Sequence, residues 1–187
     1  SECTAFWQQY LKAFNPAKLP AGEAQQCEEI FEYDFKIEKE LLNIFKSIAK
    51  ESKTTNFAIL LGLFQLALSQ TINQQDCTFG IAIGNRDHRQ LQHIIGFFSL
   101  MVPVRIKTKP EKTLEDYFQA VHKNTNQAIK NSISPDNVNS IAAENGHGRV
   151  IELIFDYVNT DTIYQNELIK FERVSSKVPL LDLQAAM

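Results

Sequence analysis

Several features that mark other classes of protein are scarce or missing in these 187 residues. No run approaches the roughly 18 consecutive apolar residues of a membrane-spanning helix. The first residues show no basic region followed by an apolar run, so no signal peptide is expected. The three cysteines, Cys3, Cys27 and Cys77, form no Cys-x-x-Cys pair, which argues against a zinc ribbon or a thioredoxin-like site. These absences favour a cytoplasmic protein with incidental or buried thiols.

An excess of positive charge is also missing. Nineteen Lys and Arg stand against 22 Asp and Glu, which gives a net charge of −3. Proteins that bind nucleic acids usually carry a strongly basic face, so no nucleic-acid partner is expected. Hydrophobic residues make up 44% and charged residues 22%, which is typical of globular proteins. A chain of this length favours one domain with a core of its own, so residues 1–187 are interpreted as a single unit.

Common catalytic and metal-binding motifs are absent as well. None of the four histidines has an acid four positions later, and no two are adjacent or spaced for a zincin-like metal site. No Gly-x-Ser-x-Gly elbow of a serine hydrolase and no Gly-x-x-x-x-Gly-Lys phosphate loop occurs. The sequence therefore predicts no catalytic residue and no metal ligand; the histidines are His88, His93, His122 and His147.

Hydrophobic periodicity predicts a mixture of helices and strands. Helical spacing occurs over residues 5–14, 38–51, 57–68 and 113–130, and strand-like runs occur over 28–37, 77–83, 97–106, 150–158, 168–174 and 180–187. Residues 134–136 are predicted to form a turn. The order favours an α/β or α+β two-layer sandwich, in which a mixed sheet packs against helices. Two helices have apolar faces that are expected to be buried: Leu41, Leu42, Phe45, Ile48 and Ala49 in one, and Leu114, Tyr117, Phe118, Val121 and Ala128 in the other.

Two stretches around the central predicted strands hold the best candidate functional residues. The first runs from Gly80 through Asn85 to Arg86, where a guanidinium at the end of a buried strand needs a carboxylate or several carbonyls. The second runs from Ile95 to Arg105. Pro103 within it indicates a sheet edge, a bulge or a break. Taken by itself, the second stretch is typical of a core strand, with Arg105 extending its head group to solvent at the end.

The order of these motifs resembles the condensation domains of nonribosomal peptide synthetases, which belong to the chloramphenicol-acetyltransferase-like superfamily. The family pattern is Ile-Gly-x-Phe-Val-Asn-Thr-x-x-x-Arg, and Ile95, Gly96, Phe98 and Arg105 match it. The Gln-rich turn before Asp76 is similar to the family's Gly-Gln-x-Asp turn. Residues 155–159 and 181–183 are similar to two further strands of the family.

The resemblance implies the fold and the role of this chain. It would be the C-terminal half of a condensation domain, cut short at its C-terminal end. The family's catalytic His-His-x-x-x-Asp-Gly lies in the N-terminal half, so the chain is expected to be inactive on its own. The implied partners are that N-terminal half, acyl or peptidyl carrier proteins, and an adenylation domain. No cofactor would bind directly, because the phosphopantetheine arms belong to the carriers.

The resemblance also implies a role for individual residues. Arg86 would anchor the two halves by an ion pair with the aspartate of the histidine motif. Residues further along the chain would form one wall of the substrate tunnel. In this chain Ser99, Leu100 and Met101 replace the family's Val-Asn-Thr, which makes that wall more apolar. The tunnel wall is predicted at Gly96, Phe98, Ser99, Leu100 and Met101, and structural roles at Asn85, Pro103, Arg105 and Asp136, the last being the one match to a His-Gln-Asp-x-Pro-Phe-Glu run.

Three functions fit these observations. The chain is part of an amide-forming enzyme of antibiotic or siderophore assembly, or part of a degenerate condensation-like domain that binds a carrier or recruits another protein. A third alternative is a free-standing acyltransferase that uses coenzyme A, but it needs a catalytic histidine, and His93 and His147 lie in no recognisable motif. The presence or absence of His-His-x-x-x-Asp-Gly upstream of this chain distinguishes the first two.

Overall fold

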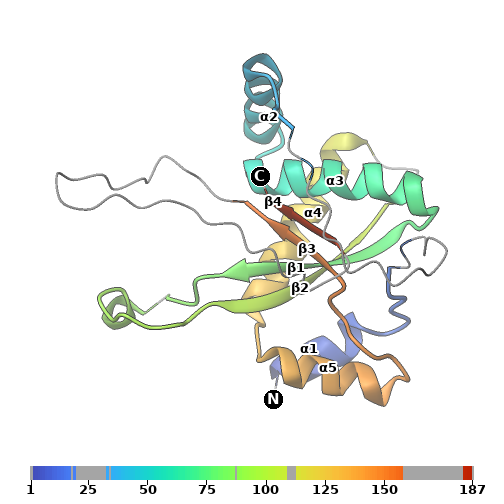
Figure 1. Cartoon of the computed structure of the whole chain (residues 1–187), viewed down its shortest axis with the longest axis vertical. Coiled ribbons are helices and arrows are strands. Elements are labelled where there is room, and N and C mark those ends of the chain that lie inside the picture. The colour runs from blue at the N-terminus through green and yellow to red at the C-terminus, as the bar shows by residue number, and fades with distance from the viewer. Residues whose placement is uncertain are drawn as a thin grey trace.

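A mixed sheet forms the centre of the protein (Figure 1). The computed structural model describes residues 2–17, 19, 33, 35–86, 88–108, 113–157 and 183–186. The strand order is β2-β1-β3-β4, in which β1 and β2 are antiparallel and the other neighbouring pairs are parallel. The predicted α/β fold with a mixed sheet is confirmed. The strands are β1 (Asp76–Ile83), β2 (Leu100–Lys107), β3 (Leu153–Asp156) and β4 (Leu183–Ala186).

Helices lie on both faces of this sheet. The sequence predicted one layer of helices against the sheet, and α1 and α5 form an additional one. Because side chains alternate along a strand, neighbouring residues of the β1–β2 pair face different helices. Phe79 packs its ring 5.8 Å from that of Phe64 in α3, whereas Arg105 on the opposite face reaches the end of α1. The helices are α1 (Glu2–Tyr10), α2 (Lys39–Glu51), α3 (Asn56–Ile72), α4 (Leu114–Lys130) and α5 (Pro135–Glu144).

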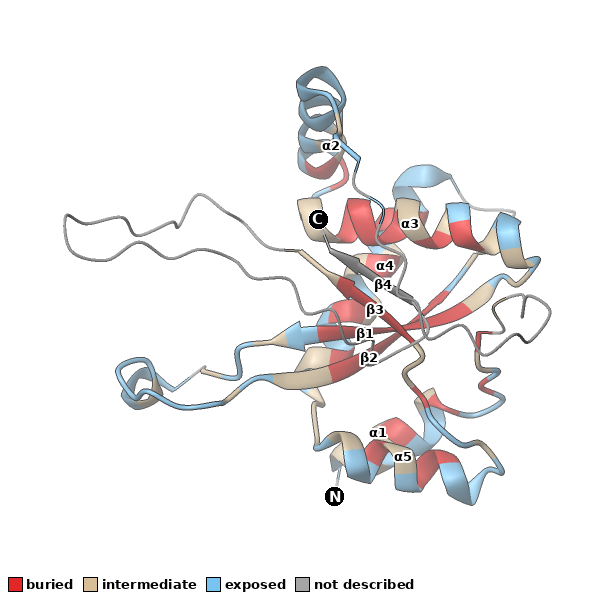
Figure 2. Ribbon diagram, viewed as in Figure 1, coloured by how far each residue is buried: buried red, intermediate tan, exposed pale blue. Residues whose placement is uncertain are grey.

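The core lies between the sheet and the helices, where buried residues gather on the strands and on α3 (Figure 2). Helix α3 is apolar on most sides, and the structure buries it, with Ile59 and Leu61 fully inaccessible. Thr55 caps it by accepting a hydrogen bond from the Ala58 N–H. The first helix also buries an apolar face, since Trp7 has no exposed surface.

Strand β2 lies at the edge of the sheet, which explains how it tolerates a proline. Pro103 pairs in register with Gly80 of β1. Proline has no N–H to donate, and an edge strand leaves one row of donors without a neighbouring strand. Gly80 has its own steric reason, because a Cβ there would lie 2.5 Å from the Cγ2 of Ile151. Of the three possibilities that the sequence left open for Pro103, the sheet edge is the one observed.

Helix α4 begins with a box-like cap. Thr113 accepts a hydrogen bond from the Asp116 N–H at 3.1 Å, and its hydroxyl donates to the Asp116 carboxylate at 2.9 Å. Tyr117 and Phe118 are buried as expected, but Leu114 is exposed. A residue in the first turn of a helix lies at the end of the apolar face, where the sheet no longer covers it.

Two sequence-based expectations about secondary structure are wrong, and two strands form over shorter ranges than expected. Residue 33 and residues 35–37, expected in a strand, form none, and Tyr33 and Phe35 are 86% and 66% exposed. The turn predicted at residues 134–136 is the start of α5, with Ser134 as N-cap and Pro135 in the first turn. The strands expected over 97–106 and 150–158 are shorter and become β2 and β3. Residues 28–32, Cys27 and the strand predicted over 168–174 lie outside the described residues.

Helix α2 forms where it was predicted, but the first part of its apolar face is uncovered. Phe45 and Ile48 pack against the core, whereas Leu41 and Leu42 are 43% and 37% exposed. An amphipathic pattern shows that a helix has an apolar face and leaves open what covers it. Among the described helices none is by itself long and apolar enough to cross a membrane; α2 and α3 meet that criterion only as a pair, across a bend of 110°.

Candidate functional site

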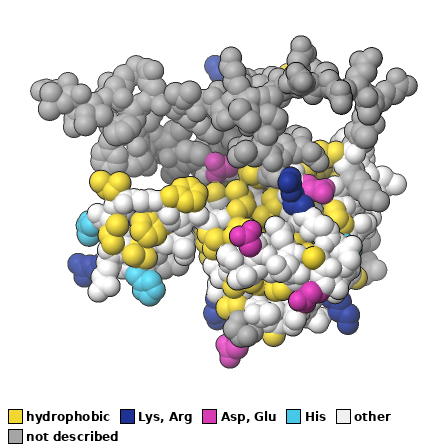
Figure 3. All heavy atoms as spheres, turned by 60° about the horizontal axis from the view of Figure 1, so that its bottom comes forward, with side chains coloured by type: hydrophobic (Ala, Val, Ile, Leu, Met, Phe, Trp, Pro, Cys, Tyr) yellow, Lys and Arg dark blue, Asp and Glu magenta, His cyan; other side chains and the backbone are white. Residues whose placement is uncertain are grey.

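The candidate site residues lie along the β1–β2 hairpin. The connection between the strands, residues 84–86 and 88–99, projects well beyond the sheet and is called the arm below (Figure 1). A single turn of 3-10 helix, Arg89–Leu91, lies within it. In the space-filling view the arm is the lobe at the left that stands apart from the main body and carries several hydrophobic side chains (Figure 3). The hairpin thus has a projecting end and a packed end.

Arg86 organises the projecting end. Its guanidinium donates to the carbonyls of Leu91, Ile94 and Gly96 at 2.6, 2.7 and 3.0 Å. It also lies 4.3 Å from the centroid of the Phe98 ring, which is cation–π geometry. The expectation that this arginine needs a carboxylate or several carbonyls is therefore met by carbonyls of its own loop. Within the described residues Arg86 has no acidic partner, and its ion pair with the N-terminal half remains a prediction.

The residues beside Arg86 adopt conformations suited to a tight loop. Asn85 has a φ of 46°, in the left-handed region that asparagine enters more readily than most residues. Gly96 packs so closely to Phe98 that a Cβ would lie 3.1 Å from the ring. The structure therefore brings together four of the predicted site residues, Asn85, Arg86, Gly96 and Phe98, in one part of the arm.

The other predicted wall residues follow along β2. Ser99 is exposed, and Leu100 and Met101 are half-buried, so none of the three lies fully in the core. Met101 and Pro103 line an apolar cavity of about 260 Å³ between β2 and Val138 of α5. Asp136 is exposed in the first turn of α5 and lies apart from the arm. The predicted wall residues thus run from the arm into the edge strand, and the structural role expected for Asp136 remains a prediction.

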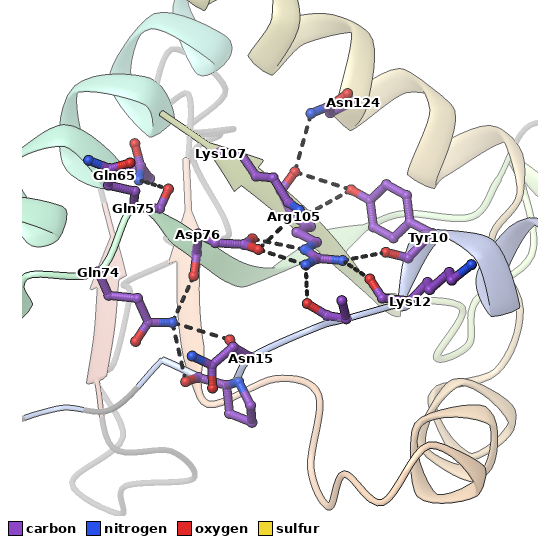
Figure 4. A network of polar contacts seen from close by, with 12 residues as sticks. Tyr10, Lys12, Asn15, Gln65, Gln74, Gln75, Asp76, Arg105, Lys107 and Asn124 are labelled. Atoms are coloured by element: carbon purple, nitrogen blue, oxygen red, sulfur yellow. Dashed lines mark hydrogen bonds and ion pairs between the residues drawn. The ribbon is translucent and has the colours of Figure 1, made fainter. Parts of the chain in front are cut away.

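Arg105 organises the packed end of the hairpin (Figure 4). Its Nε and Nη2 donate to the two carboxylate oxygens of Asp76 at 2.8 and 2.6 Å, a bidentate ion pair. The same guanidinium donates to the carbonyls of Tyr10, Lys12 and Ala13 at 2.8, 3.0 and 2.7 Å. Arg105 is 5% exposed, so it does not extend to solvent. It fastens the end of α1 to the first residue of β1.

Tyr10 completes this network, and no sequence motif pointed to its polar role. Its hydroxyl accepts a hydrogen bond from the Arg105 N–H at 2.7 Å and donates weakly to the Arg105 carbonyl at 3.4 Å. Burial raises the pKa of Tyr10 to about 12, although the neighbouring hydrogen bond and charge of Arg105 oppose that shift. The phenol therefore stays neutral near neutral pH and serves the fold rather than proton transfer.

A second buried polar cluster joins α3, α4 and the sheet. Gln65 is fully buried, and its side-chain oxygen accepts from the Tyr117 hydroxyl at 2.6 Å and from the Thr108 hydroxyl at 3.0 Å. Burial raises the pKa of Tyr117 well above its ordinary value. Burial likewise raises the pKa of the adjacent Cys77 thiol to about 11, which keeps it protonated near neutral pH. The sequence analysis missed this cluster; Gln65 stands within the apolar run 57–68, but no local pattern names its partners.

The packed end also borders a polar groove of about 770 Å³ between α1 and α4. Tyr10, Lys12, Lys107 and Lys123 are among the residues that line it. Nothing in the sequence pointed to this groove, because its walls come from segments about 100 residues apart. Across the part of the chain that the structure describes, no group of three or more His, Cys, Asp or Glu could hold a metal ion.

Comparison with known proteins gives a consistent result. Residues 1–173 match the family model of the condensation domain. Bacitracin synthase 1 of Bacillus licheniformis is 32% identical over 130 residues, which cover 67% of this chain and 2% of that protein. Tyrocidine synthase 3 of Brevibacillus parabrevis is 28% identical over 120 residues, which cover 63% of this chain and 2% of that protein. The chain thus spans a very small part of the length of these relatives.

Solved structures share the fold. A four-domain nonribosomal peptide synthetase, holo-AB3403, superposes with a TM-score of 0.73 at 18% identity over 87% of this chain and 13% of that one. The first condensation domain of the CDA synthetase superposes with a TM-score of 0.72 at 12% identity over 88% of this chain and 36% of that one. Nearly all of this chain therefore corresponds to about a third of the CDA synthetase structure.

Proposed function

The chain belongs to the condensation domain family, and we propose that it is the C-terminal half of a domain that joins two carrier-tethered groups through an amide bond. The proposal rests on the family match over residues 1–173, to which the structure adds a hairpin that holds Gly96, Phe98 and Met101 outside the core. On this proposal these residues form one wall of the substrate tunnel. The opposite wall and the catalytic histidine come from the N-terminal half.

In the proposed reaction this half contributes little to the covalent steps. The amine of the acceptor attacks the carbonyl carbon of the donor thioester, a C–N bond forms, and the C–S bond breaks. The amine loses a proton, and the departing thiolate gains one. Holding the two tethered reactants in line can contribute about 7–11 kcal/mol, so a correctly shaped wall matters even without a base. The chain contains no adjacent pair of histidines, so it is expected to be inactive alone.

The partners follow from the same proposal. Two carrier proteins would present their phosphopantetheine arms to the tunnel, and an adenylation domain would load at least one of them. Similarity to bacitracin synthase 1 and to the four-domain nonribosomal peptide synthetase holo-AB3403 supports this setting. No cofactor is proposed to bind to this chain itself.

The test is an assay of amide formation with two loaded carrier proteins. The 187-residue chain alone is expected to give no product above the uncatalysed rate. The intact condensation domain that contains it is expected to give product, and replacing the second histidine of its His-His-x-x-x-Asp-Gly motif should abolish the activity. Product from the isolated chain, or none from the intact domain, would contradict the proposal.

A second candidate is favoured by the sequence of the wall. Ser99, Leu100 and Met101 stand where the family has Val-Asn-Thr, so the polar side chains of that motif are replaced. A degenerate domain that binds a carrier without catalysis would explain this loss. Carrier binding by an intact domain that forms no amide would favour this alternative.

A further inference from the structure

The polar groove between α1 and α4 gathers positive charge in a protein whose net charge is negative. Four cationic side chains from three separate segments line it: Lys12, Arg105, Lys107 and Lys123. Two acids accompany them, Asp116 in the lining and Asp76 beside it. The groove therefore has a surplus of two positive charges, which produces a local field that attracts anions.

The positive charge at the groove is not cancelled by ion pairs. The single carboxylate of Asp76 is shared between Arg105 at 2.6 Å and Lys107 at 3.3 Å. Lys12 and Lys123 are exposed, and among the described residues neither forms an ion pair with an acid. These two ammonium groups are thus available to a ligand.

The backbone that carries the lysines is held in place by the network of Arg105 (Figure 4). Arg105 donates to the Lys12 carbonyl at 3.0 Å, and Lys107 lies two residues further along the same strand. Asn124, the neighbour of Lys123 on α4, donates to the Arg105 carbonyl at 3.3 Å. One buried arginine therefore fixes all three segments around the groove, and a site that is ordered before binding loses little conformational entropy when it binds.

We propose that this groove binds a chain of two or three linked phosphate groups, either free or as part of a nucleotide. Lysine acts on phosphate as a compact point charge, so three lysines around one groove suit several phosphates better than one. The volume of about 770 Å³ is larger than one inorganic phosphate ion and lies within the range of small-ligand pockets, roughly 300–1,000 Å³. The groove borders the end of β2 that is remote from the arm, so this site is separate from the proposed tunnel.

An extended acidic peptide is the competing ligand, and the edge of the sheet disfavours it. Peptides bind to an edge strand such as β2 through a ladder of backbone hydrogen bonds. At Arg105, however, the N–H already donates to the Tyr10 hydroxyl at 2.7 Å, and the carbonyl accepts from the Asn124 amide. Because these backbone groups are occupied, the groove favours a ligand that is recognised by its charge.

Calorimetric titration of the 187-residue chain tests this site, with tripolyphosphate, ATP and adenosine as probes in magnesium-free buffer. Tripolyphosphate and ATP are expected to bind with dissociation constants below about 1 mM at low salt, and adenosine is not. Lys12→Gln and Lys123→Gln should each weaken binding by about fivefold or more. Lys46→Gln is the matched control, because Lys46 is exposed on α2 away from the groove, and it should change binding by less than about twofold.

The comparison of probes also identifies the source of the phosphates. Equal binding of ATP and tripolyphosphate supports recognition of the phosphate chain alone, and tighter binding of ATP supports a nucleotide ligand. No binding of tripolyphosphate at about 5 mM overturns the proposal. An equal loss in Lys46→Gln, which would mean unspecific attraction, or tighter binding of a hexaglutamate peptide than of tripolyphosphate overturns it as well.

Discussion

The two ends of the β1–β2 hairpin each contain an arginine that donates to three backbone carbonyls, yet the two serve different purposes. Arg105 at the packed end is buried and reaches carbonyls 92–95 positions away in the sequence, and Asp76 neutralises its charge. Arg86 at the projecting end is only half-buried and reaches carbonyls 5–10 positions away. The first ties distant segments together, and the second shapes one loop.

The largest effect is expected from Arg105→Met. The substitution leaves the Asp76 carboxylate without its buried partner and three carbonyls of the α1 segment without a donor, so unfolding should become easier by about 3–5 kcal/mol. Urea unfolding at neutral pH measures this. Arg86→Met is the matched control, and an equal loss in the two variants would remove the distinction between the ends of the hairpin. If Arg105→Met does not fold, the milder Arg105→Lys is expected to fold with an intermediate loss.

A smaller loss is expected from Asp76→Asn. The amide keeps one acceptor for Arg105 but removes the charge, which should lower the free energy of unfolding by roughly 1.5–3 kcal/mol. Asp76 also contacts the half-exposed Lys107 at 3.3 Å. Lys107→Met, expected to cost less than about 1 kcal/mol, separates the two contacts because exposed ion pairs contribute little. An equal loss in both variants would show that Arg105 is not the main partner.

Tyr10→Phe tests the packed end through pH. Loss of the hydroxyl should cost about 1 kcal/mol at neutral pH. The folded protein raises the pKa of Tyr10 from 10.0 to about 12, so the folded state keeps a proton that the unfolded state releases. The contribution of the hydroxyl is therefore complete below pH 10 and is lost as the pH rises to 12. The stability difference between wild type and variant should shrink over that window, and a constant difference would contradict the burial of the hydroxyl.

The smallest change in global stability is expected from Arg86→Met, less than about 1 kcal/mol, because the residue is half-buried and holds only its own loop. Its effect should instead be local. Amide hydrogen exchange at residues 91–96 should become about tenfold faster, while exchange in β1 and β2 stays unchanged. Uniformly faster exchange across the sheet would mean that Arg86 supports the whole fold.

Strong periodicity accounts for the parts of the fold that the sequence predicted well. The apolar helix α3, the helix α4 and the strand β1 follow from local pattern and chemistry, which for Pro103 left the sheet edge as one of three possibilities. Propensity and capping act within a few residues, so they can be recognised without the tertiary structure. The start of α5 could also have been recognised, because Ser134 and Pro135 form an N-cap and first-turn pair.

Which polar groups form contacts with one another depends on the tertiary structure. The ion pair of Arg105 with Asp76, the contact of Tyr10 with β2, and the cluster around Gln65 join residues 29–95 positions apart, and no local pattern encodes such pairings. The exposure of Leu41, Leu42 and Leu114 could likewise not be predicted, because a hydrophobic pattern does not show which segment covers an apolar face. The sequence alone was enough to predict the family, the α/β class and the need of Arg86 for several hydrogen-bond acceptors. Chain packing determined that those acceptors lie in the arm and that Ile95 and Phe97 face solvent, since burial depends on distant segments rather than on neighbours in the chain.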